Sequence, residues 1–260
     1  MIVSRLSRAA ALALAVAAVG IAGCAKTDRQ TRADQSYVAR DVETLYNFGK
    51  ETLDLKRYKA AAQIFDEVER QHPYSVWARR AQLMSAFSYY MGREYQEAVL
   101  AAQRFLSLHP GNKDAPYAYY LIAISYYEQI IGVERDQKIT QQALDALNEL
   151  VRRYPNTDYA ADARLKIDLA RDHLAGKEME TGRWYQSQGQ YLAAIGRFRS
   201  VVDKYDTTTH VPEALERLVE SYLSLGIPEE AKKAAAVLGY NYPGSEWYQR
   251  AYRLVQKHAA

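Results

Sequence analysis

The chain has 260 residues with 34 basic and 31 acidic side chains, so its formal net charge is only +3. That small imbalance excludes the strongly basic surface that nucleic-acid binding requires. With 48% hydrophobic and 25% charged residues the composition is that of an ordinary globular protein, and a single cysteine excludes an internal disulfide or a cysteine-based zinc site.

The first 23 residues have the pattern of a secretory leader. Arg5 and Arg8 precede an uncharged run of small and apolar side chains, residues 9–19. This run is shorter than the roughly 20 apolar residues that cross a bilayer, so it fits a signal peptide better than a membrane span. An N-terminal amphipathic or buried helix is the alternative, but the charges lie only at the start of the segment. We therefore predict a signal peptide at residues 1–23.

The leader ends in "IAGC" (residues 21–24), which resembles a bacterial lipobox. Small residues let the chain lie extended in a peptidase cleft, and Cys24 supplies the thiol to be acylated. The resemblance implies three acyl chains on Cys24, because one chain alone anchors a protein only marginally. Ala25, rather than an aspartate, follows the cysteine, which implies an outer-membrane location facing the periplasm. Residues 24–36 are predicted to be a lipidated tether, because "AKTDRQTRADQS" (25–36) is polar.

From residue 37 onward, helix-favouring residues dominate and no alternating β-branched run occurs, which predicts an all-α fold. Five blocks repeat one pattern, with an alanine twelve residues before the closing position and, in four blocks, a closing proline. The blocks are 57–73, 94–110, 140–155, 190–206 and 228–243, with alanines at Ala61, Ala98, Ala143, Ala194 and Ala231.

Each block follows a predicted helix that carries a small residue and usually a tyrosine three positions later. These pairs are Gly49/Thr52, Ala86/Tyr89, Ala123/Tyr126 and Gly182/Tyr185. The pattern resembles the tetratricopeptide repeat, in which two antiparallel helices cross closely at a small side chain and a proline ends the second helix. The resemblance implies a right-handed α-solenoid of about five tetratricopeptide-like helix pairs, in two halves joined by a long helical element.

The spacing of the block alanines predicts where the two halves meet. The third repeat carries an insertion at residues 132–139, and the fourth begins with an unusually long stretch, 159–188, which is one kinked helix or two. We predict an N-terminal half at residues 37–155 with repeats one to three. The C-terminal half, residues 156–260, would hold the long helix, repeats four and five, and a capping helix at 246–257.

No catalytic constellation accompanies these repeats. The sequence lacks a phosphate-binding loop, a G-x-S-x-G nucleophile motif and an H-E-x-x-H zinc motif. The five histidines are scattered, and His72 and His109 occupy equivalent positions before helix-ending prolines, which favours a capping role. We therefore predict that the protein is not an enzyme and uses no cofactor or metal.

Binding surface is the remaining candidate, because tetratricopeptide solenoids usually hold extended peptides against the first helices of their repeats. When the positions that face the concave surface in tetratricopeptide repeats are matched to this sequence, most of the matched residues are aromatic. Such a groove suits peptides that end in an aromatic residue. Each of these tyrosines has the alternative role of packing between helices, and Tyr89 and Tyr126 favour the core. The predicted groove residues are Tyr46, Lys50, Leu53, Leu83, Phe87, Tyr90, Tyr117, Tyr120, Ile124 and Tyr127.

Four segments carry a more specific resemblance, to the BamD family of lipoproteins of the β-barrel assembly machinery. They are the lipobox, "HPYSVWARRAQLMSAFSYY" (72–90), "HPGNKDAPYAYYLIAISYYEQI" (109–130) and "RDQKITQQALDALNELVRRYPNTDYAADARLKI" (135–167). The match weakens after about residue 225, where the tail is longer than in the best-known members. The resemblance implies a non-enzymatic adaptor that docks the periplasmic domains of BamA, joins the other Bam lipoproteins and receives the C-terminal segments of unfolded outer-membrane proteins. No nucleic acid is expected as a partner.

The same family pattern places an arginine that contacts BamA in the second helix of the fourth repeat. The matching residue is Arg197, with Arg199 nearby; an ordinary exposed helix arginine is the alternative. Two other functions stay open at this point. One is a tetratricopeptide scaffold that coordinates cell-wall synthesis or another envelope complex, although such proteins commonly lack a lipobox. The other is a peptidoglycan-active enzyme, against which the missing acid or metal cluster argues.

Overall fold

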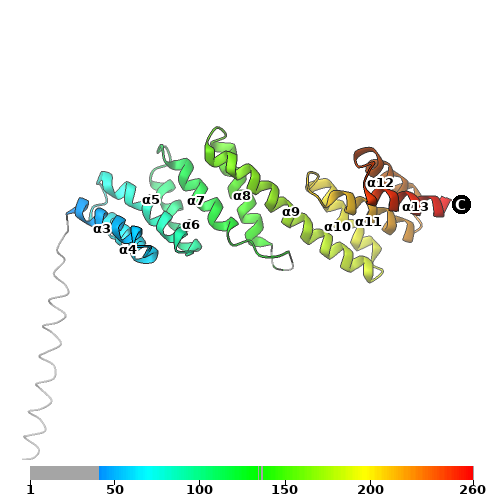
Figure 1. Cartoon of the computed structure of the whole chain (residues 1–260), viewed down its shortest axis with the longest axis horizontal. Coiled ribbons are helices and arrows are strands. Elements are labelled where there is room, and N and C mark those ends of the chain that lie inside the picture. The colour runs from blue at the N-terminus through cyan, green and yellow to red at the C-terminus, as the bar shows by residue number, and fades with distance from the viewer. Residues whose placement is uncertain (1–40, 134, 136, 260) are drawn as a thin grey trace, which may run out of the picture. The chain divides into compact units, whose positions relative to one another are not determined.

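The described part of the chain is built from α-helices. The computed structural model describes residues 41–133, 135 and 137–259, and every regular element in these ranges is helical (Figure 1). The all-α prediction is therefore confirmed. The signal peptide, Cys24 and the tether lie outside the described residues. The helices are α3 (Val42–Asp54), α4 (Tyr58–Gln71), α5 (Val76–Met91), α6 (Tyr95–Leu108), α7 (Ala115–Tyr127), α8 (Lys138–Arg153), α9 (Asp158–Ser187), α10 (Tyr191–Lys204), α11 (Val211–Ser224), α12 (Pro228–Asn241) and α13 (Glu246–Ala259).

The helices pack as successive pairs. Leu45 begins the compact unit that holds the rest of the described chain, and within it each helix from α4 onward contacts the next. Further contacts join the first helices of neighbouring pairs, α5 with α7 and α7 with α9. The second helices, α4, α6, α8, α10 and α12, are the five sequence blocks. The repeated alanines of these blocks are all fully buried, at Ala61, Ala98, Ala143, Ala194 and Ala231.

Glycines in two of the first helices lie where an aromatic ring of the second helix crosses. A Cβ atom on Gly49 would lie 2.7 Å from the Phe65 ring, and one on Gly182 would lie 2.5 Å from the Phe198 ring. Both rings are fully buried. Any side chain in place of these glycines would overlap the ring, so glycine is what allows the two helices to approach this closely.

The five second helices end with one shared geometry. Their C-cap residues have φ between −135° and −125° and ψ between 41° and 57°, and each cap N–H donates to the carbonyl four residues earlier. A residue before proline avoids the helical region, which explains four of these ends. Tyr205 precedes Asp206 and still has the same geometry, so packing also fixes the end of α10. The five C-caps are His72, His109, Tyr154, Tyr205 and Tyr242.

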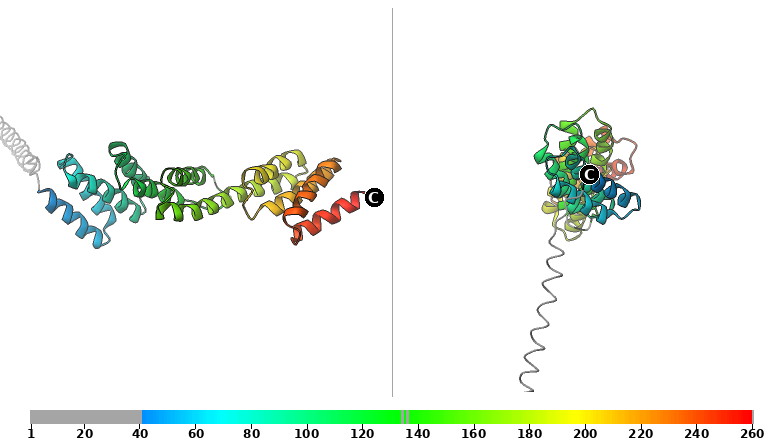
Figure 2. Two further views of the ribbon diagram at one scale, coloured as in Figure 1. Left: turned by 90° about the horizontal axis from the view of Figure 1, so that it is seen from above. Right: turned by 90° about the vertical axis from the view of Figure 1, so that its left-hand side faces the viewer.

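The long stretch of the fourth repeat is a single helix. α9 runs for 30 residues, bordering α8 in its first part and α10 in its last part (Figures 1 and 2). Thr157 begins it as an N-cap whose hydroxyl accepts from the backbone N–H of Ala160. Of the two alternatives left open by the sequence, the structure has one helix rather than two.

The core is divided into local clusters that follow the helix pairs. One cluster is centred on Phe105 and Leu121, a second on Leu147 and Leu150, and a third surrounds Phe198. α9 contributes Ala163 to the second cluster, and Ala175 and Met179 to the third. α13 covers the last pair, with Ala251 buried and the Tyr248 ring against Gly239.

Candidate partner-binding surfaces

A hollow of about 510 to 540 Å³ opens in each half of the described chain. The first, of about 540 Å³, is formed by α3, α5, the start of α7 and the loop before α7. Three of the predicted groove residues, Tyr46, Leu83 and Tyr117, line it together. Its other lining residues include three cations and one carboxylate, namely Arg79, Arg80, Lys113 and Asp114.

Aromatic packing fixes the α3 wall of this hollow. The Tyr46 ring lies 5.4 Å from the Phe65 ring and 4.8 Å from that of Trp77, and the Arg80 guanidinium lies 5.5 Å from the Trp77 ring. Burial raises the pKa of Tyr46, and the Arg80 charge opposes that rise. Tyr46 therefore serves as a neutral, rigid wall, while Arg80 remains exposed at the rim.

A second group of predicted residues forms a tyrosine cluster between α7 and α9. The rings of Tyr117 and Tyr120 lie 5.5 and 5.1 Å from that of Tyr159. The Tyr120 hydroxyl donates to Asp162 at 2.9 Å, and Lys166 donates to the same carboxylate at 2.8 Å. Burial, followed by the Asp162 hydrogen bond, raises the pKa of Tyr120 well above its usual value. These contacts join the third pair to the first turns of α9.

Sequence reasoning missed Tyr159, Asp162 and Lys166, because it took the groove from the first three repeats only. The available signal was the "RRYPNTDY" motif (152–159), which ends at Tyr159. Lys166 lies 5.5 Å from the Tyr127 ring and so brings a further predicted groove residue to the same cluster.

The remaining predicted groove residues differ in exposure. Lys50 is exposed, while Leu53, Phe87 and Tyr90 are half-buried. Ile124 is buried, so it faces the core more than a ligand. Tyr89 and Tyr126, expected in the core, are partly buried and both pack against the cluster around Phe105.

Replacing Tyr120 by phenylalanine is expected to lower the free energy of unfolding by about 1 kcal/mol, because Asp162 loses one of its two donors. Thermal and denaturant unfolding measure this change in the free energy of unfolding. Tyr117→Phe is the matched control, since Tyr117 lies in the same cluster and no hydrogen bond of its hydroxyl is found among the described residues. Equal losses in both variants would contradict a role for the Tyr120 hydrogen bond.

The two arginines predicted to contact a partner lie on opposite flanks of α10. Side chains two positions apart in an α-helix are separated by about 200° around the helix axis. Arg197 and Arg199 therefore point in nearly opposite directions. Both are exposed, and Arg197 forms an ion pair with Glu178 of α9 at 3.2 Å. Gly196, the residue before Arg197, is also exposed, and an added Cβ there would meet nothing within 4 Å. The structure therefore does not bring the two arginines together into one site.

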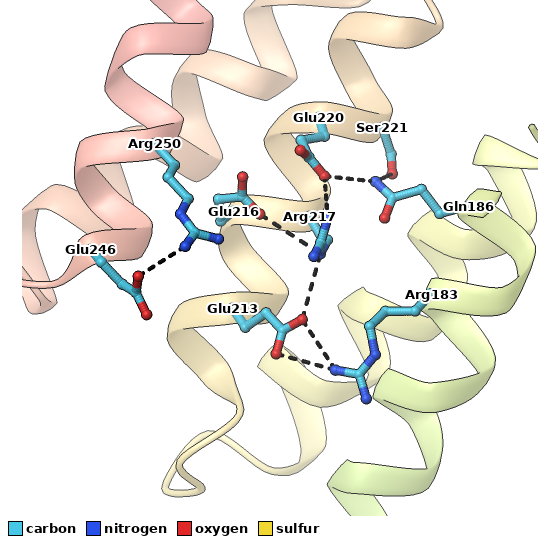
Figure 3. A network of polar contacts seen from close by, with 9 residues as sticks. All are labelled: Arg183, Gln186, Glu213, Glu216, Arg217, Glu220, Ser221, Glu246 and Arg250. Carbon is cyan, nitrogen blue, oxygen red and sulfur yellow. Dashed lines mark hydrogen bonds and ion pairs between the residues drawn. The ribbon is translucent and has the colours of Figure 1, made fainter.

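The second hollow, of about 510 Å³, follows α9, α11 and α13 and borders a network of charges (Figure 3). Arg183 of α9 donates to Glu213 at 3.1 Å, and Arg217 donates to Glu220 at 2.8 Å. Gln186 donates to Glu220 and to the Ser221 hydroxyl. The network thus ties α9 to α11 along the wall of the hollow.

Glu216 is the buried member of this network. It is 2% exposed, and its Oε2 atom has no hydrogen-bond donor among the described residues. The nearest cation is Arg217, whose Nε lies 3.8 Å from Oε2. Burial, and then the charge of Glu220, raise the pKa of Glu216 to about 7. The sequence signal was the spacing of Glu213, Glu216 and Glu220 along one helix face, which sequence reasoning did not use.

The described residues include neither a metal-binding cluster nor a membrane-spanning helix. No three His, Cys, Asp or Glu side chains of this part of the chain gather into a group that could hold a metal ion. Within the same residues, no helix combines the length and apolar character needed to span a bilayer.

Comparison with known proteins gives one family. Residues 38–238 match the model of the YfiO family, described as "Outer membrane lipoprotein". A relative from Caulobacter vibrioides, "Outer membrane protein assembly factor BamD", is 55% identical over 248 residues, covering 95% of this chain and 80% of its own. A relative of the same name from Rickettsia prowazekii is 47% identical over 246 residues, which cover 95% of this chain and 96% of the relative.

Solved structures with similar helix arrangements are more distant. The match to the TPR domain of P58(IPK) covers 90% of this chain and 63% of that domain's chain, with a TM-score of 0.43 and 16% identity. The match to the TPR protein TTC0263 of Thermus thermophilus covers 83% of this chain and 100% of that protein's chain, with a TM-score of 0.38 and 20% identity.

Proposed function

This chain belongs to the YfiO family of outer membrane lipoproteins, and from that membership we propose that it is a non-enzymatic adaptor of the outer-membrane β-barrel assembly complex. In this role its C-terminal half docks the periplasmic domains of BamA, its N-terminal half receives unfolded outer-membrane proteins, and other lipoproteins of the complex attach to it. Relatives named as outer membrane protein assembly factors over nearly the whole chain support the assembly role.

The proposed anchor is Cys24. The lipobox-like sequence before it supports acylation after cleavage at residue 23, which would hold the protein on the periplasmic side of the outer membrane. The intact mass of the mature protein tests this, because a diacylated and N-acylated Cys24 adds three acyl chains to a chain that begins at residue 24.

The proposed substrate groove is the hollow lined by Tyr46, Leu83 and Tyr117, continued by the tyrosine cluster at Tyr120 and Tyr159. Its aromatic walls offer large contact area at a small cost in conformational entropy, which suits segments with aromatic side chains. The cations Arg79, Arg80 and Lys113 at its rim outnumber Asp114, so an acidic or carboxylate-ended segment is favoured over a basic one.

The docking proposal depends on one observation, the exposed Arg197 on α10 beside the open surface at Gly196. Arginine is the residue best suited to bind a carboxylate at an interface, because its planar guanidinium matches the two oxygens. None of the described residues covers Gly196, so a partner can approach the helix backbone closely there.

Arg197→Glu is expected to lower the affinity for the isolated periplasmic domains of BamA at least about ten-fold, because repulsion replaces attraction at the contact. Isothermal titration calorimetry measures it. Arg199→Glu tests the opposite flank of α10, and Lys59→Glu in α4 is a control with the same change of charge. Unchanged affinity in the Arg197 variant would contradict the proposed contact, and absence of binding by the unchanged protein would contradict the docking role itself.

A further inference from the structure

Arg197 is held by a neighbour on the paired helix. Its Nη1 atom donates to the two carboxylate oxygens of Glu178 at 3.2 and 3.4 Å. The Glu178 side chain is 24% exposed and that of Arg197 46% exposed. The pair thus lies at the edge of the seam between α9 and α10, with the carboxylate on its more buried side.

Only one corner of the guanidinium is used by this ion pair. A guanidinium has five N–H donors in a planar fork, and Glu178 engages those of Nη1. Among the described residues, no contact occupies Nε or Nη2 of Arg197. These two nitrogens form the side-on edge that binds a carboxylate through two parallel hydrogen bonds. Arg197 can therefore keep Glu178 and still bind a second carboxylate.

The position of Glu178 is fixed by its surroundings. Met179, the next residue of α9, is fully buried, and Gly182 one turn later packs against the Phe198 ring of α10. Tyr205 lies near Glu178 as well, since burial and then the Glu178 charge raise its pKa. The backbone that carries Glu178 is therefore fixed by the packing of α9 against α10, and its carboxylate extends from a helix rather than from a loop.

We propose that Glu178 is a positioning residue, which orients the Nε–Nη2 edge of Arg197 toward an acidic side chain of the docked partner. This rests on the proposed docking through Arg197. An arginine side chain that is already ordered loses less conformational entropy on binding than a free one. Glu178 therefore increases affinity without touching the partner.

Glu178→Ala is expected to weaken binding of the BamA periplasmic domains about five-fold, which is within the cost of ordering one long side chain. In an Arg197→Ala background the same change is expected to have no further effect, because nothing remains to be oriented. Glu178→Gln keeps an oxygen that can accept from Nη1 and should recover part of the affinity. Glu180→Ala, which removes the Lys177–Glu180 ion pair of the same helix, is the matched control and should leave binding unchanged.

Calorimetry on the five variants (Glu178→Ala, Arg197→Ala, the double variant, Glu178→Gln and Glu180→Ala) and on the unchanged protein separates the two proposals. If the unchanged protein binds the periplasmic domains and Arg197→Ala weakens binding, the docking role stands. An unchanged or tighter affinity in Glu178→Ala would then overturn the positioning role, and so would an equal loss in the Arg197→Ala background. If the unchanged protein does not bind, the docking role itself fails. Thermal unfolding of each variant confirms that the helix pair stays folded.

Discussion

Replacing Gly182 by valine is expected to lower the free energy of unfolding by about 3 kcal/mol. A Cβ atom at this position would lie 2.5 Å from the Phe198 ring, which is fully buried in the cluster between α9 and α10. The added side chain forces α9 away from α10 or moves the ring, and overpacking of this kind costs about 1–3 kcal/mol or more. Denaturant unfolding followed by circular dichroism measures the loss.

Gly196→Val is the matched control, because Gly196 is also a helical glycine of the same pair. Its added Cβ would meet nothing within 4 Å, and valine is slightly the better helix former. We therefore expect the control to be neutral or slightly stabilising. Combining Gly182→Val with Phe198→Ala should cost less than the sum of the two single changes, because the smaller residue makes room. Additive losses would contradict a direct clash between the two side chains.

Replacing Glu216 by glutamine is expected to stabilise the protein at pH 8 by about 2 kcal/mol and to have little effect at pH 4. Glu216 is 2% exposed, and burial raises its pKa from 4.5 to about 7 in the folded state. A shift of that size corresponds to about 3 kcal/mol, part of which glutamine keeps because its amide is also desolvated.

The direction of the pH dependence follows from the raised pKa. Between pH 4.5 and 7 the folded protein retains a proton on Glu216 that the unfolded chain has released. Stability therefore falls as the pH rises through this window, and the loss is complete above pH 7. Arg217 and Arg250 favour the charged form, whereas Glu213 and Glu220 oppose it (Figure 3).

Unfolding curves of the unchanged protein and the variant between pH 4 and pH 8 measure this effect. Glu246→Gln is the control, because Glu246 binds Arg250 in solvent with a side chain that is 65% exposed. That variant should stay within about 0.5 kcal/mol of the unchanged protein at either pH. If Glu216→Gln raised the free energy of unfolding equally at pH 4 and pH 8, packing and not the charge of Glu216 would be responsible for the stabilisation.

The helix pairs could be predicted because their signal is local and repeated. Gly49 and Gly182 mark where Phe65 and Phe198 cross, and this follows from small and aromatic residues at fixed spacing. The common C-cap geometry before Pro73, Pro110, Pro155 and Pro243 follows from the restriction that proline places on the residue before it.

The candidate sites were less predictable, because they depend on which helices become neighbours. Tyr159, Asp162 and Lys166 belong to α9 yet complete the tyrosine cluster of α7, and no spacing within either segment indicates that contact. The continuity of α9 was undecided because helix propensity alone does not distinguish one long helix from two. The sequence also placed Arg199 near Arg197, whereas the turn of the helix points the two side chains in nearly opposite directions.

α9 contributes buried residues to two core clusters, and this affects how the protein unfolds. In a stack of repeats, each unit is stabilised mainly by its immediate neighbours, and an array can lose its repeats one at a time. α9 supplies buried residues to the clusters on both sides through one unbroken ladder of backbone hydrogen bonds. Loss of either cluster removes packing from a helix that the other cluster needs, so melting should spread through α9 and the two clusters should unfold cooperatively.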